Sequence, residues 1–319
     1  MEDTARVARV AKPGEILRPK KKLVRYLAAY LFSLPYIILM LAFGVGPAIY
    51  ALIISFTSYK DGQPQYFGAG LSNYSKAVGD FRFGSAVGNI AQFLIISVPL
   101  GIAGVLAIAL LLHARQGWYT DFLRTLYFVP GAVAGPTAIL LAIFMFDPRL
   151  SPFAPILKSL GFQTVGDVAR IQNLPVMITL IGFFGGAGGW IAIFYGALQS
   201  VSKELLEAAL IDGCSAFQSA IRIKLPLISR YIIFMFILTF AGNIQLFAEP
   251  LILNNMVVGS TVAGPTYSPN MLSYFLAFSE GNFGTAAVIS LLMVSVGLLG
   301  AFIIIYGTKF YQTDATSAS

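Results

Sequence analysis

The chain has 319 residues, of which 57% are hydrophobic and only 11% are charged, whereas soluble domains carry about 25% charged residues. Together with a mean hydropathy of +0.78, this composition excludes a soluble single-core protein and predicts a polytopic membrane protein. The net charge of +7 does not indicate nucleic-acid binding, because the long apolar runs leave no room for a basic face on a soluble fold.

The chain begins with a charged segment and continues as a series of apolar runs. Residues 1–25 contain few apolar residues, so we expect a cytoplasmic basic segment that is disordered or lies on the anionic inner leaflet. Six apolar runs follow, at 27–56, 86–112, 125–146, 173–199, 227–253 and 284–307, each long enough to cross a bilayer as a helix. The first run is too long and too late to be a cleaved signal.

These runs lack the period-two alternation of barrel strands, so the sequence predicts an all-α fold with about six transmembrane helices. The predicted membrane domain covers 26–310, and a cytoplasmic tail covers 311–319. Six of the 21 Lys and Arg residues lie on one side of the predicted spans: Lys60, Lys76, Arg82, Arg149, Lys158 and Arg170. The other side holds the remaining basic residues and both termini, and the positive-inside rule places it in the cytoplasm. The outer connections, near 57–84, 147–172 and 254–283, predict short caps and re-entrant elements.

The residues that carry chemistry in other proteins are scarce in this chain. The single Cys214 has no partner for a disulfide, and the single His113 cannot build a zinc site of histidine and cysteine ligands. Neither a phosphate-binding Gly-x-x-x-x-Gly-Lys-Ser/Thr motif nor a Gly-x-Ser-x-Gly nucleophile motif occurs in the sequence. We therefore expect no catalytic residues, no metal site and no bound cofactor in this chain.

The inner connection between the fourth and fifth runs, at 200–226, carries a pattern of its own. Ser202 precedes Lys203-Glu204 and predicts a helix N-cap, and Gly213 predicts the end of that helix. A second short helix, at about 215–223, is expected before Pro226 opens the next span. The apolar side of the first helix must be covered by the rest of the protein or by a partner.

The spacing of residues in this connection is distinctive. It reads Glu-Ala-Ala, three residues, Gly, nine residues, Ile, one residue and Leu-Pro, contributed by Glu207, Ala208, Ala209, Gly213, Ile223, Leu225 and Pro226. This pattern resembles the signature of inner-membrane permease subunits of binding-protein-dependent ABC importers. Other segments resemble the sugar-permease branch, which is related to the maltose and glycerol-phosphate importers: Leu34-Pro35, Gly46-Pro47, 70–74, 123–130 and 281–284.

The resemblance implies a type I ABC importer permease (MetI-like) fold in a bacterial or archaeal cell membrane. It implies that the 200–226 loop is a coupling element that sits in a groove of a cytoplasmic ATPase subunit. The expected partners are a second homologous permease, two ATPase subunits that bind the ATP, and an extracytoplasmic solute-binding protein. No nucleic acid is expected as a partner.

Polar residues inside apolar spans indicate a candidate path for the solute. In the fifth run, Thr239 and Asn243 share one helix face, and Gln245 shares another with Glu249. The resemblance supports the Thr239 and Asn243 face as cavity-facing, although hydrogen bonding between helices is an alternative role for both residues. Glu249 lies near the outer end of the run and is expected as a gate or boundary residue. The glycine-rich fourth run offers Trp190 as its candidate solute contact.

The function that this sequence predicts is inward transport of a sugar or oligosaccharide. A first alternative is a permease for glycerol-phosphate or another polyol-like solute. A second is an ion-coupled secondary transporter, which predicts an intramembrane carboxylate near the midplane. A third is an integral-membrane enzyme, which needs convergent His, Asp or Ser groups.

Overall fold

The computed structural model describes residues 19–60, 63–115, 117–133, 135–257 and 264–308 of the chain. Its elements divide between two compact units, Met1–Ala51 and Leu52–Ser319. Residues 1–18 of the expected basic segment and the expected tail at 311–319 lie outside the described residues.

The first unit is a helix with one local irregularity. It contains α1 (Pro19–Met40), a π-helical turn at Leu41–Val45, and most of α2 (Gly46–Ser55). The Gly46 N–H donates to the carbonyl oxygen of Leu41, five residues back, and the next residue, Pro47, has no N–H with which to restore the regular pattern. The 26 residues Tyr30–Ser55 are apolar enough and long enough to cross a bilayer.

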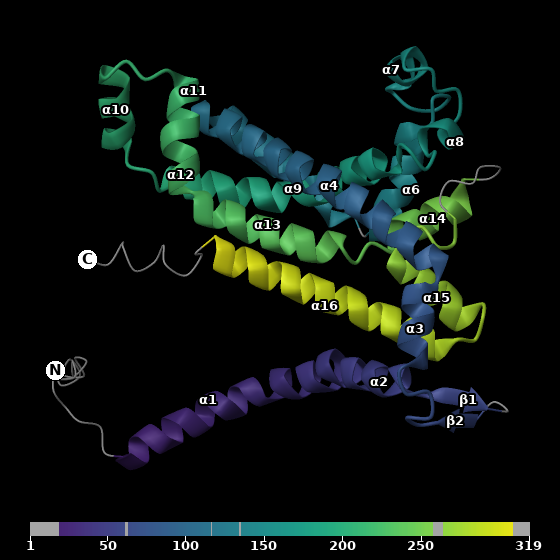
Figure 1. Ribbon diagram of the computed structural model, residues 1–319. Helices are drawn as coiled ribbons and strands as arrows, with labels where there is room; N and C mark the ends of the chain where they lie inside the picture. The colour runs from purple at the N-terminus through teal and green to yellow at the C-terminus, as the bar shows by residue number, and fades with distance from the viewer. Residues whose placement is uncertain (1–18, 61–62, 116, 134, 258–263, 309–319) are drawn as a thin grey trace, which may run out of the picture. The chain divides into compact units, whose positions relative to one another are not determined.

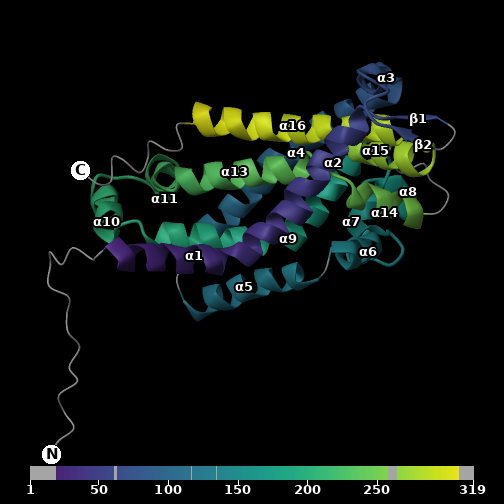
Figure 2. The same cartoon turned by 90° about the horizontal axis from the view of Figure 1, so that it is seen from below.

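The second unit is built on helices that lie side by side. Its long members are α4 (Phe81–Ala114), α9 (Leu174–Gln199), α13 (Ser229–Asn243) and α16 (Phe283–Gly307), and both views show them running along one another (Figures 1 and 2). Within the described residues, four helices are individually long enough to span a membrane, and two bent helix pairs raise the number to as many as six. The predicted all-α fold with about six spans is confirmed.

Two of the predicted runs are not continuous helices. The third run is divided into α5 (Trp118–Phe128), a 3-10 turn at Val129–Ala132 and α6 (Gly135–Phe146), with a bend of 107°. The fifth run leaves the helix after Asn243 and resumes as α14 (Ala248–Met256). The expectation of one unbroken fifth helix over 227–253 is therefore wrong, because the backbone turns at Ile244–Phe247.

One end of the second unit carries the outer connections. They form a hairpin of β1 (Ser58–Lys60) and β2 (Gln63–Gln65), in which Tyr59 lies opposite Pro64, and the short helices α3 (Ser72–Gly79), α7 (Ala154–Ser159), α8 (Val165–Val168) and α15 (Pro269–Phe278). Figures 1 and 2 place these helices at the same end of the bundle. The predicted short caps are observed here, with the hairpin as an element that the sequence did not indicate.

The opposite end of the bundle carries the connection between α9 and α13, which we call the connecting segment (Ser202–Leu227). It consists of α10 (Lys203–Ile211), α11 (Ala216–Ser219), a π-helical turn at Ala220–Lys224 (η3) and α12 (Leu225–Leu227). Figure 1 shows α10 and α11 beyond the ends of the long helices. The axis then bends by 71° into α13.

Two clusters of buried side chains hold the long helices together. One includes Phe93 of α4, Leu174 of α9 and Leu253 of α14, and lies toward the end with the outer connections. The other includes Val105 of α4 and Phe194 of α9, and lies toward the connecting segment. Between membrane helices these side chains stabilise the bundle through close van der Waals packing, because lipid tails are as apolar as the side chains and exclusion of water contributes little.

Candidate functional site

A cavity of about 460 Å³ lies inside the second unit, between α4, α9, α13 and the start of α14. Its polar lining comes from hydroxyl, amide and carboxyl side chains: Ser97, Thr179, Thr239, Asn243, Gln245 and Glu249. The aromatic lining includes Trp190, Phe183 and Phe247. The structure therefore brings the four proposed path residues, Trp190, Thr239, Asn243 and Gln245, to one cavity.

The break in the fifth run explains how these residues meet. A continuous helix would have placed Asn243 and Gln245 on different faces. Because the helix ends at Asn243, Gln245 follows in the non-helical turn and Glu249 begins the next helix, and all three line the same cavity. Glu249 is half-buried in this wall, which places it in the cavity lining instead of at a remote boundary.

Asn243 also bonds to a neighbouring helix. Its side-chain nitrogen donates to the hydroxyl oxygen of Ser97 in α4 at 2.9 Å. Ser97 is buried and itself lines the cavity. The interhelical role and the cavity-facing position that the sequence left as alternatives are thus combined in one residue.

The glycines of α9 have two separate roles. Gly182 and Gly186 line the cavity, and a side chain built on either would meet nothing within 4 Å, so these positions leave space beside Trp190. Gly188 instead packs against the backbone of Tyr127, where a Cβ atom would collide with the Tyr127 carbonyl oxygen. Trp190 packs its ring edge-on against Phe234 of α13, with centroids 5.9 Å apart.

The charge of the cavity wall is negative or zero. Glu249 is the one ionisable side chain among the described residues of the lining, which contains no lysine, arginine or histidine. Hydroxyl and amide groups beside aromatic rings suit a neutral polyhydroxylated solute, because sugars present hydroxyls at their edges and apolar C–H groups on their faces.

The connecting segment has the local structure that its sequence predicts. The Ser202 hydroxyl accepts a hydrogen bond from the Leu205 N–H at 3.1 Å, which confirms the N-cap of α10. Hydrogen bonds from its own backbone N–H and from Ser202 hold the pKa of the Glu204 carboxyl below its usual value. Gly213 has φ +81°, a conformation that glycine adopts without strain.

The segment ends in a second cap and a longer helical stretch than expected. The side chains of Ser215 and Gln218 form a reciprocal capping box at the start of α11. The helical path then continues through the π-helical turn to Leu227, four residues beyond the expected end at about 223. Of the motif residues, Glu207, Ala208 and Ala209 lie on α10, Ile223 lies in η3, and Leu225 and Pro226 lie in α12.

Two exposed apolar residues beside the Gly213 turn were not identified from the sequence. Ile211, the last residue of α10, is 86% exposed, and Phe217, the second residue of α11, is 74% exposed. Large side chains at such exposure on a polar end of the bundle indicate a surface that a partner covers. Their sequence signal was weak, because isolated apolar residues flanking a glycine turn are common.

Comparison with known proteins gives a family and a fold. Residues 100–307 match the model of the family described as "Binding-protein-dependent transport system inner membrane component". The sn-glycerol-3-phosphate transport system permease protein UgpA of Agrobacterium fabrum is 30% identical over 86% of this chain and 92% of its own. The arabinooligosaccharides transport system permease protein AraP of Bacillus subtilis is 27% identical over 84% of each chain.

Solved structures with the same fold include a chain of a bacterial alginate ABC transporter in complex with an alginate pentasaccharide-bound periplasmic protein. That chain superposes with a TM-score of 0.74 at 19% identity, covering 91% of this chain and 96% of its own.

Proposed function

This chain belongs to the family of binding-protein-dependent transport system inner membrane components, and from this we propose that it is the permease subunit of an ATP-driven importer for a neutral sugar or oligosaccharide. It crosses the membrane several times and contributes transport without covalent chemistry. The observation that carries the sugar assignment is the cavity of about 460 Å³, in which hydroxyl and amide groups from three helices converge beside Trp190.

The charge of the cavity favours a sugar over the glycerol-phosphate alternative. A phosphate group carries at least one negative charge, and sites for it use Arg, Lys or backbone N–H groups to neutralise that charge. In the described lining the ionisable group is Glu249, which repels an anion in a medium of low dielectric constant. The alternative of an ion-coupled transporter predicts an intramembrane carboxylate such as Glu249. We favour the importer over it because the chain belongs to a family whose name specifies dependence on a binding protein.

We further propose that the connecting segment couples this chain to a cytoplasmic ATPase. Glu207, Ala208 and Gly213 are exposed on it, as are Ile211 and Phe217, so a groove of the ATPase has both a small-residue surface and two apolar side chains to bind. ATP is bound by two such ATPase subunits and not by this chain. A second homologous permease and an extracytoplasmic solute-binding protein complete the importer.

The orientation of the chain follows from its basic residues. Of the 21 Lys and Arg residues of the sequence, six lie in the connections at the end that carries α3, α7 and α8, whereas the other 15 belong to the side of the predicted spans at which the end with the connecting segment lies. The positive-inside rule assigns the second end to the cytoplasm. Both termini then lie on the cytoplasmic side of a bacterial or archaeal cell membrane.

Reconstitution of the complete importer in proteoliposomes tests this function. We expect ATP-dependent uptake of a labelled neutral oligosaccharide when the binding protein is present, and no uptake of labelled glycerol 3-phosphate. The chain purified without its partners is expected to bind and hydrolyse no ATP. Uptake of glycerol 3-phosphate in preference to every neutral sugar would contradict the proposed substrate class. ATP hydrolysis by the isolated chain would contradict the proposal that separate ATPase subunits bind the ATP.

A further inference from the structure

Four side chains from four different elements meet beside the connecting segment, and we call them the His113 cluster: His113 of α4, Arg124 of α5, Tyr195 of α9 and Lys224 of η3. The Lys224 ammonium lies 3.3 Å from Nδ1 of His113. The His113 ring meets the buried Tyr195 ring edge-on, with centroids 6.2 Å apart. The Arg124 guanidinium lies over the Tyr195 ring, 4.8 Å from the ring centroid.

The geometry gives His113 the acceptor role in this contact. A lysine ammonium has three donors and no acceptor, so the contact with Lys224 needs a lone pair on Nδ1 of the imidazole. His113 therefore takes part in this contact with Nδ1 as the acceptor.

The position of the cluster makes it a mechanical link. α10 buries none of its own residues, so a force applied to α10 reaches the bundle through the stretch that follows it. In that stretch Leu225 packs on the core cluster that includes Leu112 and Leu198. Contact between apolar side chains has no preferred direction. The hydrogen bond from Lys224 needs its donor and acceptor aligned, so it holds η3 in one register against α4.

We propose that His113 is a positioning residue that transmits movement of the connecting segment to α4 by accepting a hydrogen bond from Lys224. The proposal rests on the proposed coupling role of the segment. A side chain that keeps an acceptor at the place of Nδ1 should therefore keep the coupling, and a side chain without an acceptor should lose it.

The other charged and titratable groups of the cluster do not replace this contact. Arg124 pairs with Asp121 of its own helix at 3.1 Å and faces the Tyr195 ring. Arg124 cannot supply Lys224 with an acceptor, because a guanidinium group only donates hydrogen bonds.

Three substitutions of His113 test the proposal in the reconstituted importer. In His113→Asn the amide oxygen takes the place of Nδ1 and accepts from Lys224 without titrating. In His113→Gln the acceptor lies farther out, nearer the place of Nε2. In His113→Leu no acceptor remains. The readout is solute-stimulated divided by basal ATP hydrolysis, together with uptake, at pH 6 and pH 8, with ATP supplied to the side that the ATPase subunits face.

We expect His113→Asn to keep the wild-type stimulation ratio at both pH values. His113→Leu should show a ratio about tenfold lower than the wild type at both values, the effect of losing one charge-assisted hydrogen bond, with normal assembly of the complex. His113→Gln should lie between the two.

A second readout is independent of transport. A fluorophore on Cys214, the single cysteine of the chain, reports the environment of the connecting segment in the assembled, nucleotide-free importer. Its emission should differ between the wild type and His113→Leu, and not between the wild type and His113→Asn. Normal stimulation by His113→Leu, or a defect in His113→Asn as large as that in His113→Leu, would overturn the proposal. Absence of any solute-stimulated hydrolysis in the wild type would instead overturn the proposed function, and the positioning role with it.

Discussion

Asn243 shows how one side chain combines a structural and a transport position. It holds α13 to α4 through Ser97, and it lies on the wall of the cavity at the point where α13 ends. An amide has two N–H donors and a carbonyl acceptor, so one bond to Ser97 leaves further groups for the hydroxyls of a sugar. The two roles are separable because only one of them needs Ser97.

We expect Asn243→Ala to raise the solute concentration needed for half-maximal uptake by about five- to 150-fold, since an unpaired solute hydroxyl costs about 1–3 kcal/mol. Ser97→Ala removes the interhelical bond, and the side chain it shortens is only 3% exposed, so it should leave this concentration within about threefold of the wild type. Uptake kinetics at matched membrane abundance give the comparison. Equal defects in the two variants would show that Asn243 acts only between the helices.

At the scale of single elements, the turn after α10 depends on a backbone conformation. Gly213 has φ +81° and nothing lies within 4 Å of the position of a Cβ atom, so space is available and only the dihedral angle restricts the residue. A left-handed conformation costs about 1–2 kcal/mol for an ordinary residue and more for a β-branched one. The orientation of α10 against α11 is therefore encoded in this one glycine.

Gly213→Val should leave membrane abundance unchanged and lower solute-stimulated ATP hydrolysis, because the strained turn redirects α10. Gly213→Asn is the matched control, since asparagine tolerates positive φ, and it should retain most of the stimulation. If the valine variant hydrolyses ATP and transports normally, α10 is not the coupling element.

The packing of α9 on α5 depends on a second kind of glycine. Gly188 is buried and has no room for a Cβ atom beside the Tyr127 backbone, whereas its neighbour Gly189 has nothing within 4 Å. Gly188→Ala should destabilise the purified protein by about 1–3 kcal/mol, the cost of overpacking a filled contact. Gly189→Ala should change the thermal midpoint little. Thermal unfolding in detergent distinguishes them, and a larger effect at Gly189 would contradict the described contact.

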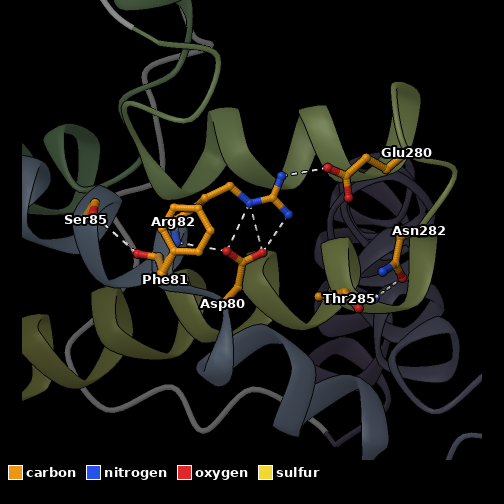
Figure 3. Close-up of polar contacts among 7 residues, drawn as sticks. All are labelled: Asp80, Phe81, Arg82, Ser85, Glu280, Asn282 and Thr285. Atoms are coloured by element: carbon orange, nitrogen blue, oxygen red, sulfur yellow. Dashed lines mark hydrogen bonds and ion pairs between the residues drawn. The ribbon is translucent and has the colours of Figure 1, made fainter.

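At the scale of the whole second unit, an ion-pair network joins the start of α4 to the turn between α15 and α16. Asp80 caps α4 by accepting from the Arg82 N–H at 2.9 Å, and it receives the Arg82 guanidinium at 2.7 Å (Figure 3). Arg82 also reaches Glu280 at 2.6 Å. The network therefore links segments that are 198 residues apart in the sequence.

Hydrogen bonding from Arg82 holds the pKa of Asp80 below its usual value. The carboxylate thus stabilises the fold above the unfolded pKa of about 3.9, and this contribution is lost as the pH falls through the lower, folded value. Asp80→Asn keeps a capping oxygen but not the charge. We expect its thermal midpoint to lie below that of the wild type at pH 7 and to approach it below about pH 4. A constant difference at all pH values would exclude the ionised carboxylate as the cause.

The sequence by itself determined the membrane location, the helical class and the N-cap, glycine turn and motif register of the connecting segment. Each of these depends on local properties, namely the length of an apolar run, the charge of its flanks and the conformational preference of Ser202 or Gly213. That Thr239 and Asn243 share a helix face also followed from the sequence, because they are four residues apart, whereas the expectation that this face lines a cavity came from the family resemblance.

Only the tertiary structure decided what depends on contacts between distant segments. The break at Ile244–Phe247 is not encoded by a proline or a glycine run. It brings Gln245 and Glu249 to the cavity that Asn243 lines, whereas a continuous helix would have placed both on a different face. In the same way, His113 and Lys224 are 111 residues apart. Their pairing requires α4 and the connecting segment to pack at one end of the bundle, and no local pattern records which residues that packing brings together.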